Sequence, residues 1–463
     1  MQITIRLILL SFSTLLLTAC ANFSAGNLFS HYSAQNQEVY RAVKQGDYVA
    51  AEQALPNEIA GDILDNFEKG RVYLLNNDDE QSLSAFKLSD QAIRKEQDKA
   101  TVSLSDTATS IGSLAVNDNL KLYQPADYEL GFLHLYLGLN YIKENKLDDA
   151  LVEMRRANQV QERAKAERER QLEAAQSEME SKGLTPNLGS VLSKYPDAGK
   201  KLQAVQNAYL MYLSALLYEA DNDLNSAYVD YRRALAVMPD NQTVIDSTMR
   251  TARRLGMSED LRLLEKRYGK AKANIPGKGR VIVLQEQDTV EAMQDWKLSL
   301  PLYDSRGNGA LYSLALPYYP SVSSVQFSPL RVNQQVIPKA LLADVNLMAQ
   351  QDLSERMPSI VIRQALRVVA KDQLRREAAG KDDVGNLLFN VWNTLTEQAD
   401  TRSWQTLPAQ VYSSTLMVDA GKQRLDIGGE TYQFNVSEGN TVLVWLSRQG
   451  NSATMWHKQL GRL

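Results

Sequence analysis

The chain has 463 residues, with 51 basic and 55 acidic side chains and a formal net charge of −4. This near-balance, without a clustered basic patch, argues against a nucleic-acid partner. Cys20 is the only cysteine, so an intramolecular disulfide framework is excluded.

Residues 1–19 are typical of a secretory signal peptide. One positive side chain, Arg6, precedes an apolar run over residues 7–17. As a helix this run spans about 16 Å, which is too short for a hydrocarbon core of about 30 Å. No later stretch reaches the length of apolar sequence that a membrane span needs, so no transmembrane segment is expected after processing.

The sequence LTAC at residues 17–20 resembles the lipobox of bacterial lipoproteins. The resemblance implies cleavage before Cys20, acylation of its sulfur, and a lipidated linker over residues 20–30. Several acyl chains anchor a protein stably where a single chain does not. In such lipoproteins Ala21, rather than an aspartate, implies export to the outer membrane. The alternative is an ordinary signal peptide with a chance cysteine near its end.

Residues 31–272 are expected to form helical repeats. Three segments share a small residue, an aromatic at +3, a small residue at +12, a large one at +16 and a small one at +19. The three sets are Gly70, Tyr73, Ser82, Phe86 and Ser89; Gly138, Tyr141, Ala150, Met154 and Ala157; and Ala215, Tyr218, Ala227, Tyr231 and Ala234. A fragment with Gly46, Tyr48 and Ala51 precedes them.

This spacing resembles the tetratricopeptide repeat, a helix–turn–helix unit of about 34 residues. Small residues let two antiparallel helices approach closely, and the large residue fills the space between them. The pattern therefore predicts a tetratricopeptide-like solenoid, with an irregular helical bundle as the alternative.

The first helices of such a solenoid line a concave groove. Apolar and aromatic side chains at groove-facing positions suit a peptide or helix ligand. The residues at these positions are Phe67, Leu74, Phe132, Leu135, Tyr209 and Tyr212. The alternative is that neighbouring helices of an irregular array cover them.

From residue 273 onward, helical periodicity gives way to strand-like alternation, and residues 273–463 are expected to form an α+β domain. Runs with strand-like alternation lie between residues 280 and 332 and again between 410 and 448. Helical periodicity returns between Lys339 and Gln398, which predicts a helical insertion. The last strands are expected to form an antiparallel sheet, with a hairpin turn over residues 427–430. The fold class expected for the whole chain is thus an N-terminal helical solenoid followed by an α+β domain.

The lipobox, the repeats, the run GKGRVIVL and the later ADTRSWQTLPAQV together resemble a family of Gram-negative lipoproteins with no assigned activity. The sharpest element is formed by Asp400, Arg402, Ser403, Trp404, Leu407 and Pro408. Members are often encoded beside a lipoprotein that activates peptidoglycan synthases, which implies a role in the cell envelope. The resemblance carries no active site.

No catalytic constellation stands out from the sequence. His31, His134 and His457 are far apart and lack metal-ligand spacing, and no nucleophile elbow or phosphate loop is present. We therefore expect no catalytic residues, no metal and no cofactor. Arg402 and Trp404 are open to two interpretations. They either lie on an exposed rim that contacts a partner, or Trp404 is buried and anchors the returning strands while Arg402 pairs with Asp400.

These observations favour an outer-membrane lipoprotein that faces the periplasm and binds a protein partner there. It would act as a scaffold or regulator of an envelope assembly for peptidoglycan synthesis or export. Its partners would be membrane lipid, through acylated Cys20, and a periplasmic or outer-membrane protein. The alternative is an enzyme that binds or cleaves a cell-wall glycan or peptide, which would require convergent carboxylates or a metal. A purely structural tether is a third hypothesis.

Overall fold

The computed structural model describes residues 30–56, 58–102, 122–161, 202–270, 275–303, 309–322, 325–379 and 398–462, together with residues 163 and 177. Helices fill the first half, and strands begin after Tyr268. The helices are α3 (Tyr32–Gln35), α4 (Gln37–Gln45), α5 (Tyr48–Gln53), α6 (Asp62–Leu75), α7 (Asp79–Val102), α9 (Asp127–Lys143), a helical stretch over 147–161, α12 (Leu202–Val205), α13 (Ala208–Ala220), α14 (Leu224–Val237), α15 (Gln242–Arg254) and α16 (Ser258–Tyr268).

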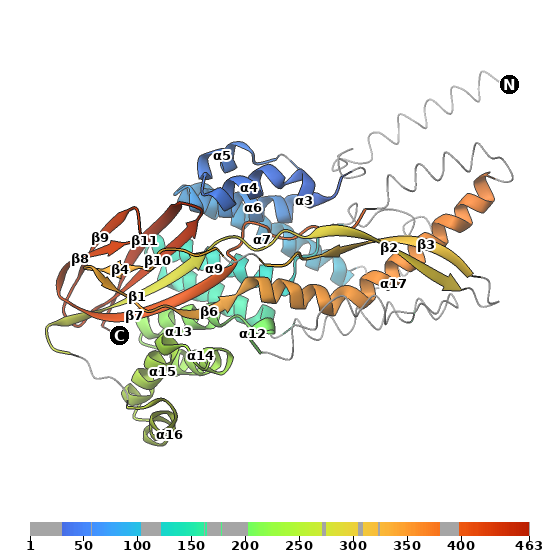
Figure 1. The fold of residues 1–463 in the computed structure, drawn as a ribbon. Coiled ribbons are helices and arrows are strands. Elements are labelled where there is room, and N and C mark those ends of the chain that lie inside the picture. The colour runs from blue at the N-terminus through green and yellow to red at the C-terminus, as the bar shows by residue number, and fades with distance from the viewer. Residues whose placement is uncertain are drawn as a thin grey trace.

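The second half is a mixed α/β structure (Figure 1). Its strands are β1 (Lys278–Gln287), β2 (Gln294–Tyr303), β3 (Gly309–Tyr318), β4 (Arg331–Val332), β5 (Gln335–Val336), β6 (Ala340–Asp344), β7 (Gln410–Asp419), β8 (Gly421–Asp426), β9 (Thr431–Val436), β10 (Thr441–Gln449) and β11 (Ser452–Gly461). One long helix, α17 (Val345–Ala379), lies between β6 and β7 and confirms the expected helical insertion. The remainder of that insertion, up to residue 397, lies outside the described residues.

The repeat spacing has a direct packing counterpart. A β-carbon built on Gly70 would lie 2.5 Å from the ring of Phe86, and one built on Gly138 would lie 2.5 Å from the terminal methyl of Met154. The small residue of the first helix thus receives the large residue at +16 from the next helix. In the third segment, where Ala215 replaces glycine, both Ala215 and Tyr231 are fully buried.

The turns between paired helices repeat as well. Gly46, Asn77, Asn145 and Asn222 all have a left-handed backbone, with φ between 61° and 80°. The three asparagines each stand seven residues after the small residue of their segment. Glycine and asparagine tolerate this conformation best, so the chain can reverse sharply between helices. These equivalent helical hairpins agree with an internal repeat.

A five-stranded sheet in the order β11-β10-β1-β7-β6 forms the centre of the second half. β1 pairs with β10 in parallel and with β7 antiparallel, so the sheet is mixed. The expectation of an antiparallel sheet is therefore wrong for the pair of β1 and β10. Parallel neighbours need a long connection between them, and here β2 through β9 lie between β1 and β10 in the chain.

The two faces of this sheet are covered differently. Ile282, Leu284 and Trp445 point into one core with the helices. Val281 and Val444, on the opposite face, join the core beneath a second sheet in the order β5-β4-β8-β9. The molecule therefore stacks helices, a central sheet and a small outer sheet, and the helical half shares one core with the α/β half.

Other expectations for this half are partly confirmed. β8 and β9 form an antiparallel hairpin in which the amide of Ile427 donates to the carbonyl of Glu430, as expected for a turn over residues 427–430. Residues 340–344 were expected to be helical but form β6, which pairs with β7. The last strand, β11, falls outside the runs recognised in the sequence and pairs with β10.

A ribbon of β2 and β3 runs beside α17, and Figure 1 shows these elements extending away from the central sheet. Their contact buries Leu314 and Leu316 of β3 against Leu353 and Met357 of α17. We refer to β2, β3 and α17 as the arm. No helix among the described residues is long and apolar enough to cross a membrane.

Candidate functional site

The six side chains expected to line an open groove lie inside the molecule. None has more than 1% of its surface exposed, and they are Phe67, Leu74, Phe132, Leu135, Tyr209 and Tyr212. They belong to α6, α9 and α13, the first helices of the three hairpins, as the repeat pattern predicts. The same core contains Trp404 and Trp445 from the second half. The expectation of an exposed groove is therefore corrected, because the protein's own chain covers this helical surface.

The segment that covers it most directly comprises residues 398–409, just before β7, and we call it the strap. Trp404 stands at its centre and is fully buried. Its ring stacks on Phe67 at a centroid distance of 4.4 Å and an interplanar angle of 21°. It also meets Phe86 and Tyr136, each at 5.7 Å. The strap thus fills the space between α6, α7 and α9 with one aromatic side chain.

Two glutamates of the helices bind the backbone of the strap. The amide of Trp404 donates to Oε1 of Glu129 at 2.7 Å, and the amide of Gln405 donates to Oε1 of Glu68 at 2.8 Å. The hydroxyl of Thr406 donates to Oε2 of Glu68 at 2.6 Å. Amides in an irregular buried segment must find acceptors, and these carboxylates supply them. The helical surface therefore holds an extended stretch of chain by its backbone as well as by an aromatic anchor.

Glu68 is also tied to the first helices of the chain. Its Oε1 accepts from the hydroxyl of Tyr32 at 3.2 Å and from Nδ2 of Asn36 at 3.4 Å. Only 2% of Glu68 is exposed, and this burial raises the pKa of its carboxyl to about 7, against the opposing effect of its hydrogen-bond donors. Burial likewise raises the pKa of Glu129. Both carboxyls are thus shifted toward the protonated form by the dry core.

A third buried acid, Glu286 of β1, collects side chains from all three hairpins. It forms a salt bridge with Arg71 of α6, in which Nη2 lies 2.7 Å from Oε2 and both side chains are fully buried. The hydroxyls of Tyr136 (α9) and Tyr209 (α13) donate to it at 3.3 and 3.1 Å. Nε1 of Trp445, on β10, donates at 3.2 Å. Glu286 therefore fixes the central sheet against three helices at a single point.

Arg71 connects this point to the strap. Its Nε donates to the carbonyl of Thr406 at 3.2 Å, and its Nη2 donates to the hydroxyl of Ser447 at 2.9 Å. The guanidinium lies 4.7 Å from the ring centre of Tyr136, within the range of a cation–π contact. The buried charge of Arg71 keeps all of these partners only when the strap and the sheet are both docked on the helices. Any other docking would leave the charge buried without them, so the arrangement favours this one.

The second interpretation of Arg402 and Trp404 agrees with the structure. Arg402 forms a bidentate pair with Asp400, with Nε–Oδ1 at 2.9 Å and Nη2–Oδ2 at 2.7 Å. Arg402 is 9% exposed and Trp404 is fully buried, so neither lies on an exposed rim. Trp404 differs from expectation in one respect, because it anchors the strap on the helices rather than on the returning strands.

Two of the three histidines pair with carboxylates in places that join elements. His134 Nδ1 of α9 lies 2.7 Å from Glu153, and His31 Nε2 lies 3.3 Å from Asp295 of β2. His457 meets the hydroxyl of Tyr432 at 2.7 Å. Within the described ranges, no group of three or more His, Cys, Asp and Glu side chains is placed to hold a metal ion.

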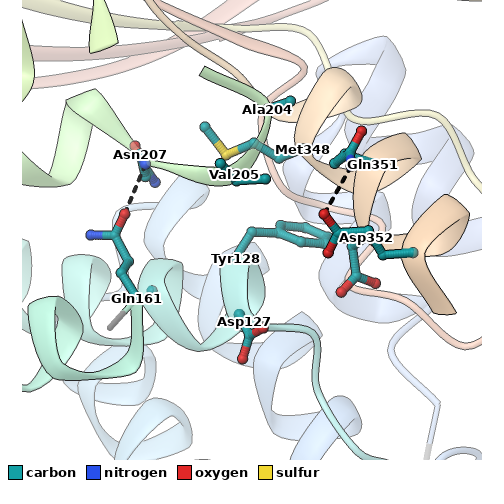
Figure 2. Close-up of a pocket in the computed structure, with 11 residues that line it drawn as sticks. Asp127, Tyr128, Gln161, Ala204, Val205, Asn207, Met348, Gln351 and Asp352 are labelled. Atoms are coloured by element: carbon teal, nitrogen blue, oxygen red, sulfur yellow. Dashed lines mark hydrogen bonds between the residues drawn. The ribbon is translucent and has the colours of Figure 1, made fainter. Parts of the chain in front are cut away.

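A pocket lies where α9, α12 and α17 meet the end of the helical stretch 147–161 (Figure 2). Tyr128 and Met348 form its apolar part, and Asp127 and Asp352 lie at its edge. Gln161 accepts a hydrogen bond from the amide of Asn207 at 2.8 Å across one side. These contacts join the helical half to α17, and they place no nucleophile beside a base.

The residues that do most to unite the two halves were absent from the sequence-based candidates. They are Glu68, Glu129 and Glu286. A signal existed for Glu286, because it alternates with Ile282 and Leu284 on one face of an apolar strand, where an acid needs a buried partner. Glu68 directly follows the groove position Phe67, and Glu129 lies about one turn before Phe132, but amphipathic helices carry many such acids.

The predicted signal peptide and lipidation site, including Cys20 and Ala21, lie outside the described residues. No protein-family model and no curated protein matches the sequence. Among solved structures, one titled "MamA AMB-1 P212121" is similar over 50% of this chain and 87% of its own, with 12% identity and a TM-score of 0.27.

Proposed function

We propose that the protein is a lipid-anchored scaffold of the Gram-negative cell envelope that binds a protein partner and performs no catalysis. The observation that carries the proposal is the docking of the strap. Equivalent helical hairpins hold an extended segment through Trp404, Glu68 and Glu129. In this protein that binding surface serves to fix the α/β half, and with it the arm, in one orientation.

The buried acids support a binding role over hydrolysis. A glycoside or peptide hydrolase needs carboxylates or a metal facing a substrate cleft. Glu68, Glu129 and Glu286 instead accept hydrogen bonds from amides, hydroxyls and an arginine of the same chain. Their oxygens are used to hold the halves together.

Because the strap covers the helical surface, we place the partner contact on the arm. Among the described residues its ribbon has two strands, β2 and β3, and the addition of a strand at an edge is a common way to bind an extended segment. The occupant in this proposal is an extended segment of a periplasmic or outer-membrane protein of the peptidoglycan-synthesis or export machinery. Lys297 of β2 is exposed on this ribbon.

Site-specific photocrosslinking in intact envelopes tests the binding role. A photoreactive residue at Lys297 should recover one dominant protein neighbour. The matched control is the same residue at Lys266, which is exposed on α16 far from the arm in Figure 1. Equal recovery from both positions, or recovery of glycan fragments alone, would contradict the proposal.

The lipid anchor has its own test. Metabolic labelling with an alkynyl fatty acid should label the wild type and leave Cys20→Ser unlabelled, since the sulfur is the acceptor. Ala21→Asp should keep the label but move the protein from the outer to the inner membrane fraction. A labelled Cys20→Ser variant would refute acylation at this position.

A further inference from the structure

A second concavity lies where α17 passes the start of β2, the end of β3, and the beginning of the strap. We call it the arginine pocket. It has a volume of about 150 Å³, the size of an engineered cavity that takes up a benzene ring. Leu353 and Ile360 of α17 and Met293 supply an apolar wall. At the rim, Leu122 is 49% exposed, which leaves apolar surface facing the opening.

Basic residues outnumber acidic ones in the lining of this pocket. They are Arg356, Arg363 and Arg402 against a single acid, Asp400. Arg402 is held by Asp400 in the bidentate pair described above. Arg356 pairs with Asp352 one turn earlier on α17, an acid that faces the neighbouring pocket. The carboxylates therefore match two of the three guanidinium groups.

Arg363 is the cation left over. It stands seven residues after Arg356, so the two share a face of α17. It is exposed, and the described part of the chain contributes no carboxylate to it. Nε of Arg356 is also buried without a hydrogen-bond partner. Buried donors are normally satisfied, and Arg356 lines the pocket, so a ligand bound there can supply the missing acceptor.

We propose that the arginine pocket binds an anionic group, a carboxylate or a phosphate, that carries a short apolar chain. Arg363 and Arg356 receive the anion, because guanidinium groups match the geometry of carboxylate and phosphate oxygens. The wall of Leu353, Ile360 and Met293 receives the apolar part. The proposal does not depend on acylation of Cys20 or on partner binding by the arm.

Titration calorimetry on the purified full-length chain tests the two halves of the site. Octanoate should bind, and acetate should bind at least tenfold more weakly because it lacks the apolar part. Octyl glucoside, whose alkyl chain is one carbon longer and which has no charge, should bind at least tenfold more weakly than octanoate. Equal binding of octanoate and octyl glucoside, or no binding of octanoate, overturns the proposal.

Variants assign the binding to this pocket. Arg363→Ala should weaken octanoate binding about tenfold or more, and Arg363→Lys, which keeps the charge but not the guanidinium geometry, should restore only part of it. Arg363 is exposed, so these changes leave the fold intact. The matched control is Arg262→Ala on α16, where the side chain is 70% exposed and pairs with Glu259. An Arg363→Ala variant that binds octanoate as the control does refutes the site.

Vesicles distinguish the source of the anion. If the ligand is a lipid head group, phosphatidylglycerol vesicles should be bound through Arg363 and phosphatidylcholine vesicles should not. If it is a free amphiphile, octanoate should bind while neither vesicle shows dependence on Arg363. Each result supports the pocket with a different source, and loss of dependence on Arg363 for all of these probes refutes it.

Discussion

Neutralising Glu286 while keeping its shape should be among the most destabilising single changes in this protein. In Glu286→Gln, the guanidinium of Arg71 stays buried without the carboxylate that lies 2.7 Å away in the wild type. Removal of one partner from a buried ion pair costs about 3–5 kcal/mol. Glutamine retains one oxygen for Tyr209 and Trp445, which donate to Oε1. We therefore expect a loss near the lower end, about 3 kcal/mol.

A double-mutant cycle separates the ion pair from its surroundings. Arg71→Met alone leaves the carboxylate of Glu286 without its cation. Combining Arg71→Met with Glu286→Gln removes both charges, and the new amide can donate to the hydroxyls of Tyr136 and Ser447, which contact Oε2 in the wild type. The double variant should thus lose less stability than the sum of the losses measured for the two single variants, with a coupling energy of about 2 kcal/mol.

Urea unfolding followed by tryptophan fluorescence is a suitable assay, because Trp404 and Trp445 are fully buried in the shared core. Circular dichroism should give a coincident transition if the two halves unfold together. The control is Glu259→Gln, an exposed pair with Arg262 on α16 that should change stability by less than about 0.5 kcal/mol. If Glu286→Gln unfolds at the same urea concentration as this control, the proposed role of the buried pair is wrong.

Three further changes test the strap and the turns. Trp404→Ala should lower the free energy of unfolding by about 3–5 kcal/mol in the same urea assay, and a loss below 1 kcal/mol would contradict its role as an anchor. Since burial raises the pKa of Glu68 to about 7, the folded state holds this proton more tightly than the unfolded state. Stability should therefore fall, by on the order of 3 kcal/mol, as pH rises from about 4.5 to 7, and Glu68→Gln should flatten that slope; a slope unchanged by the substitution refutes the assignment. Gly46→Ala should cost more than Gly256→Ala in thermal unfolding, because both have positive φ but only the first would bring a β-carbon within 2.4 Å of the carbonyl of Gln449; equal losses would show that this contact is unimportant.

Local packing within the hairpins was predictable because it depends on residues close in sequence. The spacing of a small residue and a large one at +16 describes the meeting of Gly70 with Phe86 and of Gly138 with Met154. The turn residues Asn77, Asn145 and Asn222 repeat at one spacing too, and a search that included left-handed turn signals would have found them.

Sheet order was less accessible, because it depends on contacts between distant segments. Alternating apolar residues identify β1 and β10 as strands, but both are buried on two faces. Neither strand carries a sequence signal for their parallel pairing, which joins segments separated by more than 150 residues. The short strand β6 was hidden in a run whose composition favours helix, and pairing with β7 overrides that preference.

The groove positions show a different limit of sequence reasoning. The repeat pattern placed Phe67 and Tyr209 on the first helices of their hairpins, α6 and α13. It could not state what covers them, because apolar side chains suit a partner, a neighbouring helix or the protein's own strap equally well. Trp404 was the available clue, since a tryptophan in a short irregular segment between a helical region and a strand needs a buried site.

The buried carboxylates explain why the strap, rather than any apolar segment, occupies this surface. A surface of rings alone would accept many ligands. Glu68 and Glu129 instead present acceptors that must be met by amides or hydroxyls in one register, and the amides of Trp404 and Gln405 meet them. Leaving such a group unpaired in the core costs about 1–3 kcal/mol or more, so mismatched segments are rejected. A partner helix, whose amides are already used within the helix, could not replace the strap; only an extended segment with free amides at the same spacing could do so.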